Sequence, residues 1–206
     1  MSTLPTGWVE DSIQAACGAA AERVEIVDAR PKEIPALIER GRIDGGIGLR
    51  RDSYFPGIDL WTEGYAVALP KTHRFSEMQS LRAADIAAET MFVRRGCEAL
   101  AEVSRPFTSR GIRPFMSART DNDERAVSYV RSGLGITVMP LCFADEGLSL
   151  VPLAGFGLTR TVSVMLAADK PDLLAKSQAL SCLAERLRSR AAQTLTSLVS
   201  GQLEDS

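Results

Sequence analysis

The sequence predicts an α/β fold, formed either as one large domain or as two small lobes. Segments with the 3.6-residue period of amphipathic helices alternate regularly with short apolar segments of high strand propensity. The chain has 206 residues, which is enough to bury a sizeable core. Its 45% apolar and 24% charged residues are close to the averages for soluble globular proteins.

The first quarter of the chain contains two predicted helices, each followed by a predicted strand. The spacing of apolar residues predicts a helix over Trp8–Ala21, and the alternation in Arg23–Ala29 predicts a strand. A second helix is expected over Pro31–Arg40, with Gly41 as its left-handed C-cap. The glycine-rich apolar segment Ile43–Leu49 then predicts a short buried strand that another element can approach closely.

The middle of the chain begins with a segment that is long for a single strand. Leu60–Pro70 could pass from one lobe into another. A short helix is expected over Leu81–Ala88, a strand from Met91 to Val93 and a helix over Cys97–Ser109.

The last third continues the alternation. The pattern of Asp123–Arg131 predicts a helix. Asp121 and Glu124 resemble a capping box at its start, and Gly133 supplies the stop at its end. The remaining elements are expected over Ile136–Met139, Leu148–Leu153 and Thr161–Ala167 as strands, and over Asp172–Ser197 as an amphipathic helix. Regular alternation predicts parallel sheets with crossover helices, which bind ligands at the carboxyl ends of their strands. A cleft between two lobes is therefore the default site.

Charge and hydropathy narrow the class of function. A net charge of −2 argues against broad phosphate binding, which requires a clustered basic surface. No apolar run is long enough to span a membrane, and the N-terminal residues lack the pattern of a signal peptide. These features predict a cytoplasmic protein.

The residues that usually carry catalysis or metal binding are sparse. The four cysteines form no CxxC pair, which favours reduced thiols over disulfides or a zinc site. His73 is the only histidine, so histidine-based triads and multi-histidine metal sites are hard to build. The carboxylates Asp121, Asp123 and Glu124 are better explained as helix caps than as metal ligands. We therefore expect no enzyme activity, no metal and no cofactor.

Four segments in order, covering much of the chain, resemble the effector-binding domain of LysR-type transcriptional regulators. The third contains Val–x–x–Gly–x–Gly–Ile followed by an aliphatic residue and proline, and the second ends in Pro–x–x–His, although Arg74 replaces the family's usual next proline. The segments are Leu37–Leu49, Leu60–Phe75, Asp123–Pro140 and Leu150–Ala167. No single segment is decisive, but their order identifies the chain as similar to this family.

The resemblance implies two Rossmann-like lobes, similar to type 2 periplasmic binding proteins and joined by two crossover strands. The first lobe is expected over residues 1–67 and 160–206, and the second over residues 68–159. A small-molecule effector is expected in the cleft between them. Family members pair as dimers, and as tetramers at full length. The implied dimer contacts are Trp8 and Ile13 on the first helix, and Val127 and Arg131 on a helix of the second lobe.

The resemblance has two departures. The family's winged helix-turn-helix and linker helix are absent from this sequence, so operator DNA is expected to be a partner only through that missing part. The family's first strand is missing or reduced to Ser2–Pro5.

The resemblance implies three groups of effector-binding residues, and each has a plainer explanation. Thr3 and Thr6 precede the first helix, where hydroxyls either meet the effector or cap the helix. The turn Arg94, Arg95, Gly96 and Cys97 places two guanidinium groups beside a helix N-terminus, which suits an anion, unless the arginines are only solvated. Thr120 and Asp121 lie at the cleft's edge, where they can also act as caps. We hypothesise an anionic effector held by Arg94 or Arg95.

Two other functions remain open at this stage. Cys97 lies near two arginines at a predicted helix start, so its pKa is expected to be lowered, as in a redox sensor. However, Pro106 occupies the position of the second cysteine of peroxide-sensing relatives, which favours Cys97 as a small residue of the pocket. The other alternative is a free-standing solute-binding protein of the same fold.

Overall fold

The computed structural model describes residues 3–19, 22–50, 54–144 and 147–204. Contacts divide the chain into two compact units: unit 1 is Met1–Thr62 with Arg160–Ser197, and unit 2 is Glu63–Thr159 with Leu198–Ser206. Strand β2 (Gly57–Pro70) contains the first of the three boundaries, β7 (Thr159–Leu166) contains the second, and the third lies between Ser197 and Leu198. The lobes proposed from the sequence have their first boundary at residues 67 and 68, within the same strand β2.

Unit 1 is built on an antiparallel pair of strands. β1 (Gly45–Leu49) pairs with β7, which is also a neighbour of β2. Helix α2 (Ile34–Glu39) packs closely on this pair, because a Cβ atom at Gly46 would lie 2.4 Å from Cγ2 of Ile34. The glycine therefore lets the helix approach the strand, as the sequence predicted.

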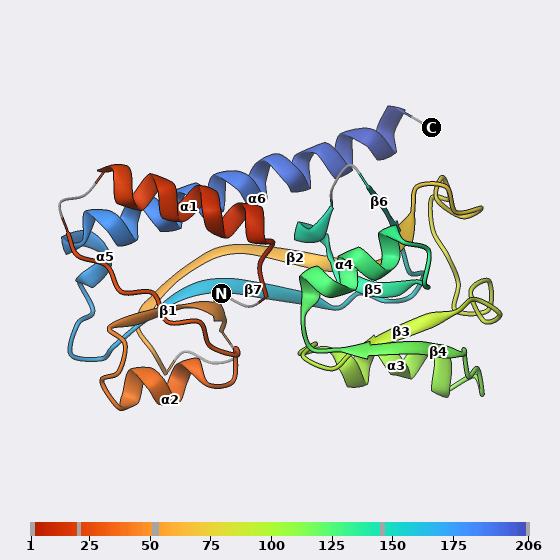
Figure 1. Ribbon diagram of the computed structural model, residues 1–206, viewed down its shortest axis with the longest axis horizontal. Coiled ribbons are helices and arrows are strands. Elements are labelled where there is room, and N and C mark those ends of the chain that lie inside the picture. Colours follow the sequence, from red (N-terminus) through yellow and green to blue (C-terminus); the bar gives the residue numbers. More distant parts are fainter. Residues whose placement is uncertain (1–2, 20–21, 51–53, 145–146, 205–206) are drawn as a thin grey trace. The chain divides into compact units, whose positions relative to one another are not determined.

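Two long helices lie on the other side of the unit 1 strands (Figure 1). They are α1 (Thr6–Ala19) and α6 (Gln178–Glu204), and the short α5 (Leu173–Lys176) precedes α6. Arg186 of α6 forms an ion pair with Asp11 of α1, at 3.2 Å. Because Leu183, Leu187 and Ala191 are buried on α6, the apolar stripe predicted there faces the core.

Unit 2 contains two sheets. β2 pairs in antiparallel fashion with β5 (Thr137–Pro140) and β6 (Leu148–Pro152). β3 (Met91–Arg94) and β4 (Met116–Thr120) form a separate parallel pair. Its helices are α3 (Leu100–Thr108), α4 (Asp123–Arg131) and the short η1 (Leu141–Phe143).

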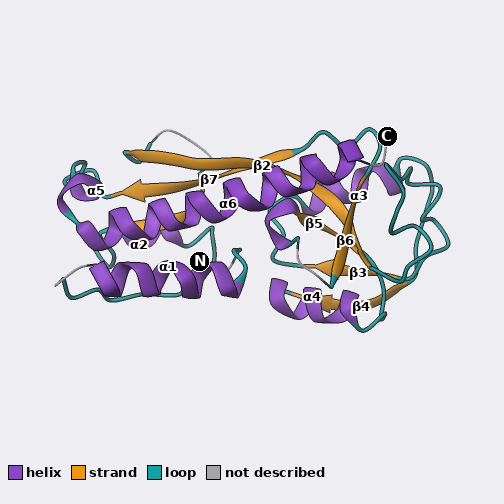
Figure 2. Cartoon of the chain, turned by 90° about the horizontal axis from the view of Figure 1, so that it is seen from above, coloured by secondary structure: helices purple, strands orange, loops and turns teal. Residues whose placement is uncertain are grey.

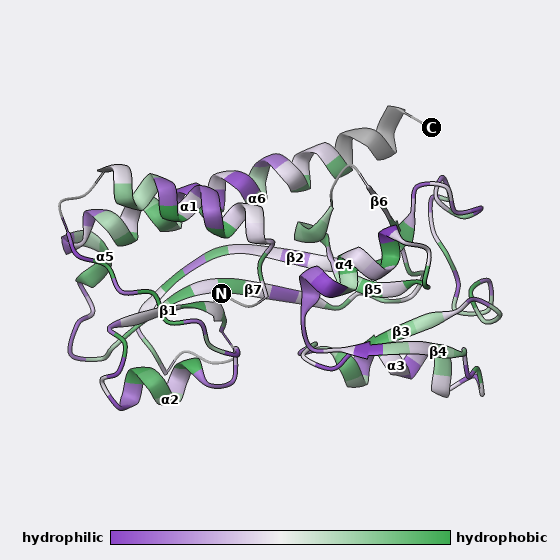
Figure 3. Ribbon diagram, viewed as in Figure 1, coloured by the Kyte–Doolittle hydropathy of each residue, from purple (hydrophilic) through white to green (hydrophobic). Residues whose placement is uncertain are grey.

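Helices α3 and α4 lie on opposite sides of the β3–β4 pair (Figures 1 and 2). The apolar core of unit 2 includes Val67, Leu81, Ile86 and Val151. Figure 3 shows that β3 is hydrophobic along most of its length, whereas the start of α4 is strongly hydrophilic. The carboxyl ends of β3 and β4 therefore pass from an apolar core into a polar surface.

The structure corrects several predicted elements. Arg23–Ala29 forms no strand, and its apolar side chains are exposed, with Val24 at 49% and Ile26 at 47%. A strand requires a hydrogen-bonding neighbour, and no described strand pairs with this segment. Leu81–Ala88 forms turns and an isolated bridge instead of a helix. β4 was not predicted, because its sequence MSART lacks an apolar run.

The sheets also differ from the expected parallel arrangement. Three described ladders, β1–β7, β2–β5 and β2–β6, are antiparallel, and only β3–β4 is a parallel ladder. Alternation of helices and strands along the chain does not determine which strands become neighbours or in which direction they run, so it did not predict these antiparallel ladders.

The ends of two predicted segments, residues 20–21 and Ser2, lie outside the described part of the chain. None of the described helices combines the length and the hydropathy needed to cross a bilayer.

Candidate functional site

The carboxyl ends of β3 and β4 lie side by side. Arg94 is opposite Thr120 in the register, and the backbone N–H of Arg95 donates to the carbonyl oxygen of Thr120 at 2.6 Å. A Cβ atom at Gly96 would lie 3.1 Å from the carbonyl oxygen of Asp121, so the two turns are in close contact. We call Arg95, Gly96, Thr120 and Asp121 the strand-end rim. This is the edge at which parallel strands commonly bind ligands.

Asn122 begins the helix that follows the rim. Its side-chain oxygen accepts a hydrogen bond from the backbone N–H of Arg125 at 2.8 Å, while Thr120 Oγ1 accepts one from Asn122 N–H at 3.1 Å. The capping box expected at Asp121 is therefore wrong by one residue, and Asn122 is the N-cap of α4.

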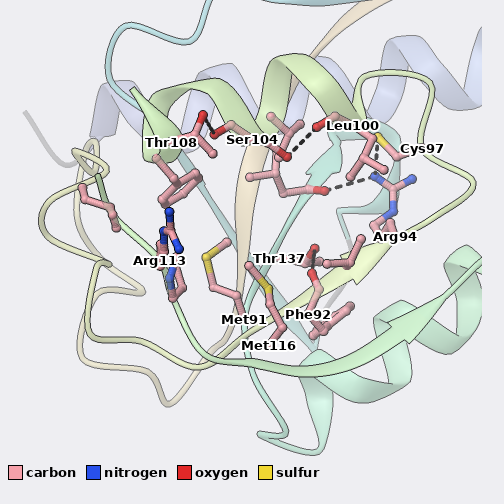
Figure 4. A pocket seen from close by; sticks show the side chains of 16 residues that line it. Met91, Phe92, Arg94, Cys97, Leu100, Ser104, Thr108, Arg113, Met116 and Thr137 are labelled. Atoms are coloured by element: carbon pink, nitrogen blue, oxygen red, sulfur yellow. Dashed lines mark hydrogen bonds between the residues drawn. The ribbon is translucent and has the colours of Figure 1, made fainter. Parts of the chain in front are cut away.

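Arg94 directly precedes the rim residue Arg95 and is buried, and Figure 4 shows its guanidinium group close to Cys97. Its Nε and Nη2 donate to the Oδ1 and Oδ2 atoms of Asp123 at 2.8 and 2.7 Å, and Nη1 donates to the carbonyl oxygen of Val138 at 3.0 Å. Burial by itself would lower the pKa of Arg94, but the charge and hydrogen bonds of Asp123, with smaller contributions from Cys97 and Glu98, together raise it. All three guanidinium nitrogens therefore have acceptors within unit 2, whereas the Arg95 side chain is exposed.

Cys97 differs from its predicted chemistry. Burial raises the pKa of its thiol. The positive charge of Arg94, whose Nη1 atom lies 3.7 Å from Sγ, lowers this pKa but offsets the effect of burial only in part. In addition, α3 begins at Leu100, three residues after Cys97, so the thiol is not at the start of the helix. The expectation of a lowered pKa is therefore wrong.

Two further side chains of this region were not singled out in the sequence. Tyr65 on β2 donates its hydroxyl to Oε1 of Glu98 at 2.5 Å, next to Cys97 in the chain. The negative charge of Glu98 also raises the pKa of Cys97, although less than burial does. The sequence offered no signal for this pair, because its two residues are 33 positions apart.

The other predicted effector contacts belong to unit 1. Thr3 is buried, and its carbonyl oxygen accepts from Arg160 Nη2 at 3.1 Å. Thr6 is the first residue of α1 and is exposed. The predicted effector residues of unit 2 therefore lie close together in the structure. Thr3 and Thr6 belong to unit 1.

The residues expected at a dimer interface differ in exposure. Trp8 on α1 is buried against Trp61, with ring centroids 5.8 Å apart, and Val127 on α4 is also buried. Ile13 is half-buried and Arg131 is exposed. Within the described residues, no group of three or more His, Cys, Asp or Glu side chains is placed to hold a metal ion.

Comparison with known proteins connects this fold to one family. The family model described as "LysR substrate binding domain" matches residues 20–192. The HTH-type transcriptional regulator cbl of Klebsiella aerogenes is 28% identical over 118 residues, which is 55% of this chain and 37% of that protein. The chain therefore matches little more than a third of the length of this curated relative.

Solved structures of regulators share the fold. A C-terminal domain of a probable LysR family transcriptional regulator from Rhodococcus sp. RHA1 has a TM-score of 0.67 and 18% identity, covering 89% of this chain and 92% of that one. HinK, a LysR family transcriptional regulator from Pseudomonas aeruginosa, has a TM-score of 0.63 and 19% identity, with coverage of 89% and 66%.

A third solved structure extends the similarity to almost the whole chain. An OxyR mutant from Corynebacterium glutamicum has a TM-score of 0.67 and 16% identity, with coverage of 95% and 64%. At these identities the likeness concerns the fold alone. It confirms the predicted α/β class of the type 2 periplasmic-binding-protein kind.

Proposed function

The chain belongs to the LysR substrate-binding domain family, and from this premise we propose that it is the effector-binding and oligomerisation part of a transcriptional regulator. In this proposal a small molecule binds the domain and changes transcription, without catalysis and in the cytoplasm. Contact with operator DNA belongs to a helix-turn-helix of the whole regulator, as the name of the cbl relative suggests for that protein.

The observation that carries the proposal is the strand-end rim. The carboxyl ends of two parallel strands meet there, and the buried Arg94–Asp123 pair supports the turn from below. Arg95 adds an exposed guanidinium group on the same turn. An exposed guanidinium group suits a carboxylate or phosphate, to which it can donate two parallel hydrogen bonds. We therefore propose an anionic effector held by Arg95, with Gly96, Cys97, Thr120 and Asp121 around it.

The test is a thermal-shift screen of small carboxylates and phosphates, followed by calorimetry of the compounds that stabilise the protein. Arg95→Ala is expected to weaken binding of such an effector about tenfold or more, which corresponds to the loss of a charged hydrogen bond. Arg105→Ala, an exposed arginine on α3, is the matched control and should bind normally. Unchanged affinity in Arg95→Ala would remove the rim from the proposal.

We also propose that the regulator is a homodimer through α1 and α4. Since Trp8 and Val127 are buried within their own units, the contacts depend more on Ile13 and Arg131. Sedimentation of Ile13→Asp and Arg131→Glu should show dissociation into monomers, whereas an unchanged mass would contradict this interface.

The two alternatives receive less support. A redox sensor through Cys97 requires a thiolate, and the raised pKa of this thiol disfavours one. A free-standing solute-binding protein would bind its ligand tightly as a monomer, and the same sedimentation experiment distinguishes it.

A further inference from the structure

Unit 2 contains a cavity of about 300 Å³ between α3 and strands β3, β4 and β5 (Figure 4). Most of its wall is apolar and includes Met91, Leu100, Phe107 and Met116. The volume is at the lower end of the range of small-molecule sites. A largely apolar pocket of this kind favours the binding of apolar molecules.

The polar groups of the wall have their hydrogens directed to the backbone. Ser104 donates to the carbonyl oxygen of Leu100 at 2.8 Å, Thr108 to that of Ser104 at 3.1 Å, and Thr137 to that of Phe92 at 3.0 Å. A ligand therefore meets few available donors and gains mainly from the burial of apolar surface.

Two cationic side chains among the described residues line the cavity, and their surroundings differ. Arg94 is neutralised by Asp123, and the other cationic side chain, Arg113, is exposed. None of the described residues that line the cavity is acidic. The wall thus tolerates a neutral molecule and does not repel one whose polar end lies near Arg113.

We propose that this cavity is a second ligand site, which takes a small apolar molecule such as a single ring with a short substituent. None of the four residues of the strand-end rim lines this cavity, although Cys97 borders both. The second site does not depend on the rim binding the effector, so the two proposals can fail separately.

The experiment uses methionine methyl signals, because Met91 and Met116 line the cavity. The protein is labelled with ¹³C at its methionine methyl groups, the signals are assigned with Met91→Leu and Met116→Leu, and toluene and phenol are titrated in. We expect the Met91 and Met116 signals to shift saturably. The exposed Met78 and the buried Met165 of unit 1 should stay in place. Stationary Met91 and Met116 signals, or equal shifts of all methionines, would overturn the proposal.

A matched pair of α3 variants tests the location. Ser104→Phe should fill the cavity and weaken toluene binding about tenfold or more, since each tenfold step is about 1.4 kcal/mol. Ala101→Phe places the same ring at an exposed position of the helix and should leave binding unchanged. Undiminished binding in folded Ser104→Phe contradicts the site, and if that variant does not fold, the wild-type titration still decides. Arg95→Ala should retain toluene binding even where it loses the anionic effector.

Discussion

Arg94 at the end of β3 and Asp123 at the start of α4 form a buried ion pair with two hydrogen bonds, at 2.8 and 2.7 Å. The same guanidinium group donates to the carbonyl oxygen of Val138 on β5. One side chain therefore joins two strands and a helix beneath the strand-end rim. Its charge is satisfied inside the protein, which leaves Arg95 as the cation of the rim that faces solvent.

Removing one partner of this pair should strongly destabilise the protein. Asp123→Ala leaves a buried, uncompensated guanidinium group, and the expected loss of unfolding free energy is about 3–5 kcal/mol. Urea denaturation measures it. Arg95→Ala is the control, and as an exposed substitution it should change stability by about 0.5 kcal/mol at most. Equal stabilities of the two variants would show that the pair contributes nothing.

The Cys97 thiol should react slowly. Because burial raises its pKa, little thiolate exists at neutral pH, and we expect iodoacetamide to modify the exposed Cys17 well before Cys97. Mass spectrometry of the peptides after timed labelling at pH 7.5 separates the two sites. Labelling at Cys97 that precedes labelling at Cys17, or its rapid oxidation by mild peroxide, would restore the redox hypothesis.

Glu89 should make stability depend on pH. Partial burial pushes its pKa up, but the hydrogen bonds and charges of Arg74 and His73 together outweigh this effect, and its pKa is lowered below the ordinary 4.5. As the pH falls, the unfolded chain takes up this proton before the folded protein does. The stability that Glu89 contributes is therefore fully present above its ordinary pKa and is lost as the pH falls from that value through the lowered pKa of the folded protein. Glu89→Gln should flatten the stability curve between about pH 5 and 3. Parallel curves for variant and wild type would contradict this sign.

Gly57 should tolerate no side chain. Its φ is +150°, and a Cβ atom there would lie 1.9 Å from the carbonyl oxygen of Val164. We expect Gly57→Ala to cost about 2 kcal/mol or more, from backbone strain and the clash together. Gly64→Ala on the same strand is the control, because its nearest contact would be an ordinary 3.8 Å. Thermal unfolding of both variants gives the comparison, and similar melting temperatures would be evidence against the strain.

The sequence by itself determined the α/β class, the family and the positions of most elements. Helix α4 begins and ends where its apolar period and Gly133 predict, and Gly133 has the expected positive φ of 74°. These signals are local, because a helix or a turn depends mainly on residues a few positions apart. For the same reason the turn from Arg94 to Cys97 could be placed near Thr120 only through the family resemblance.

The tertiary structure decided what depends on distant partners. Asp123 is 29 residues from Arg94, and only their approach turns a predicted ligand contact into a buried ion pair. The pKa of Cys97 is raised, where the sequence predicted a lowered one, because the effect of burial outweighs that of the neighbouring Arg94 charge. Arg23–Ala29 has a strand's alternation but no described strand pairs with it. Hydrogen-bond partners and desolvation are set by contacts across the chain, and local patterns do not contain them.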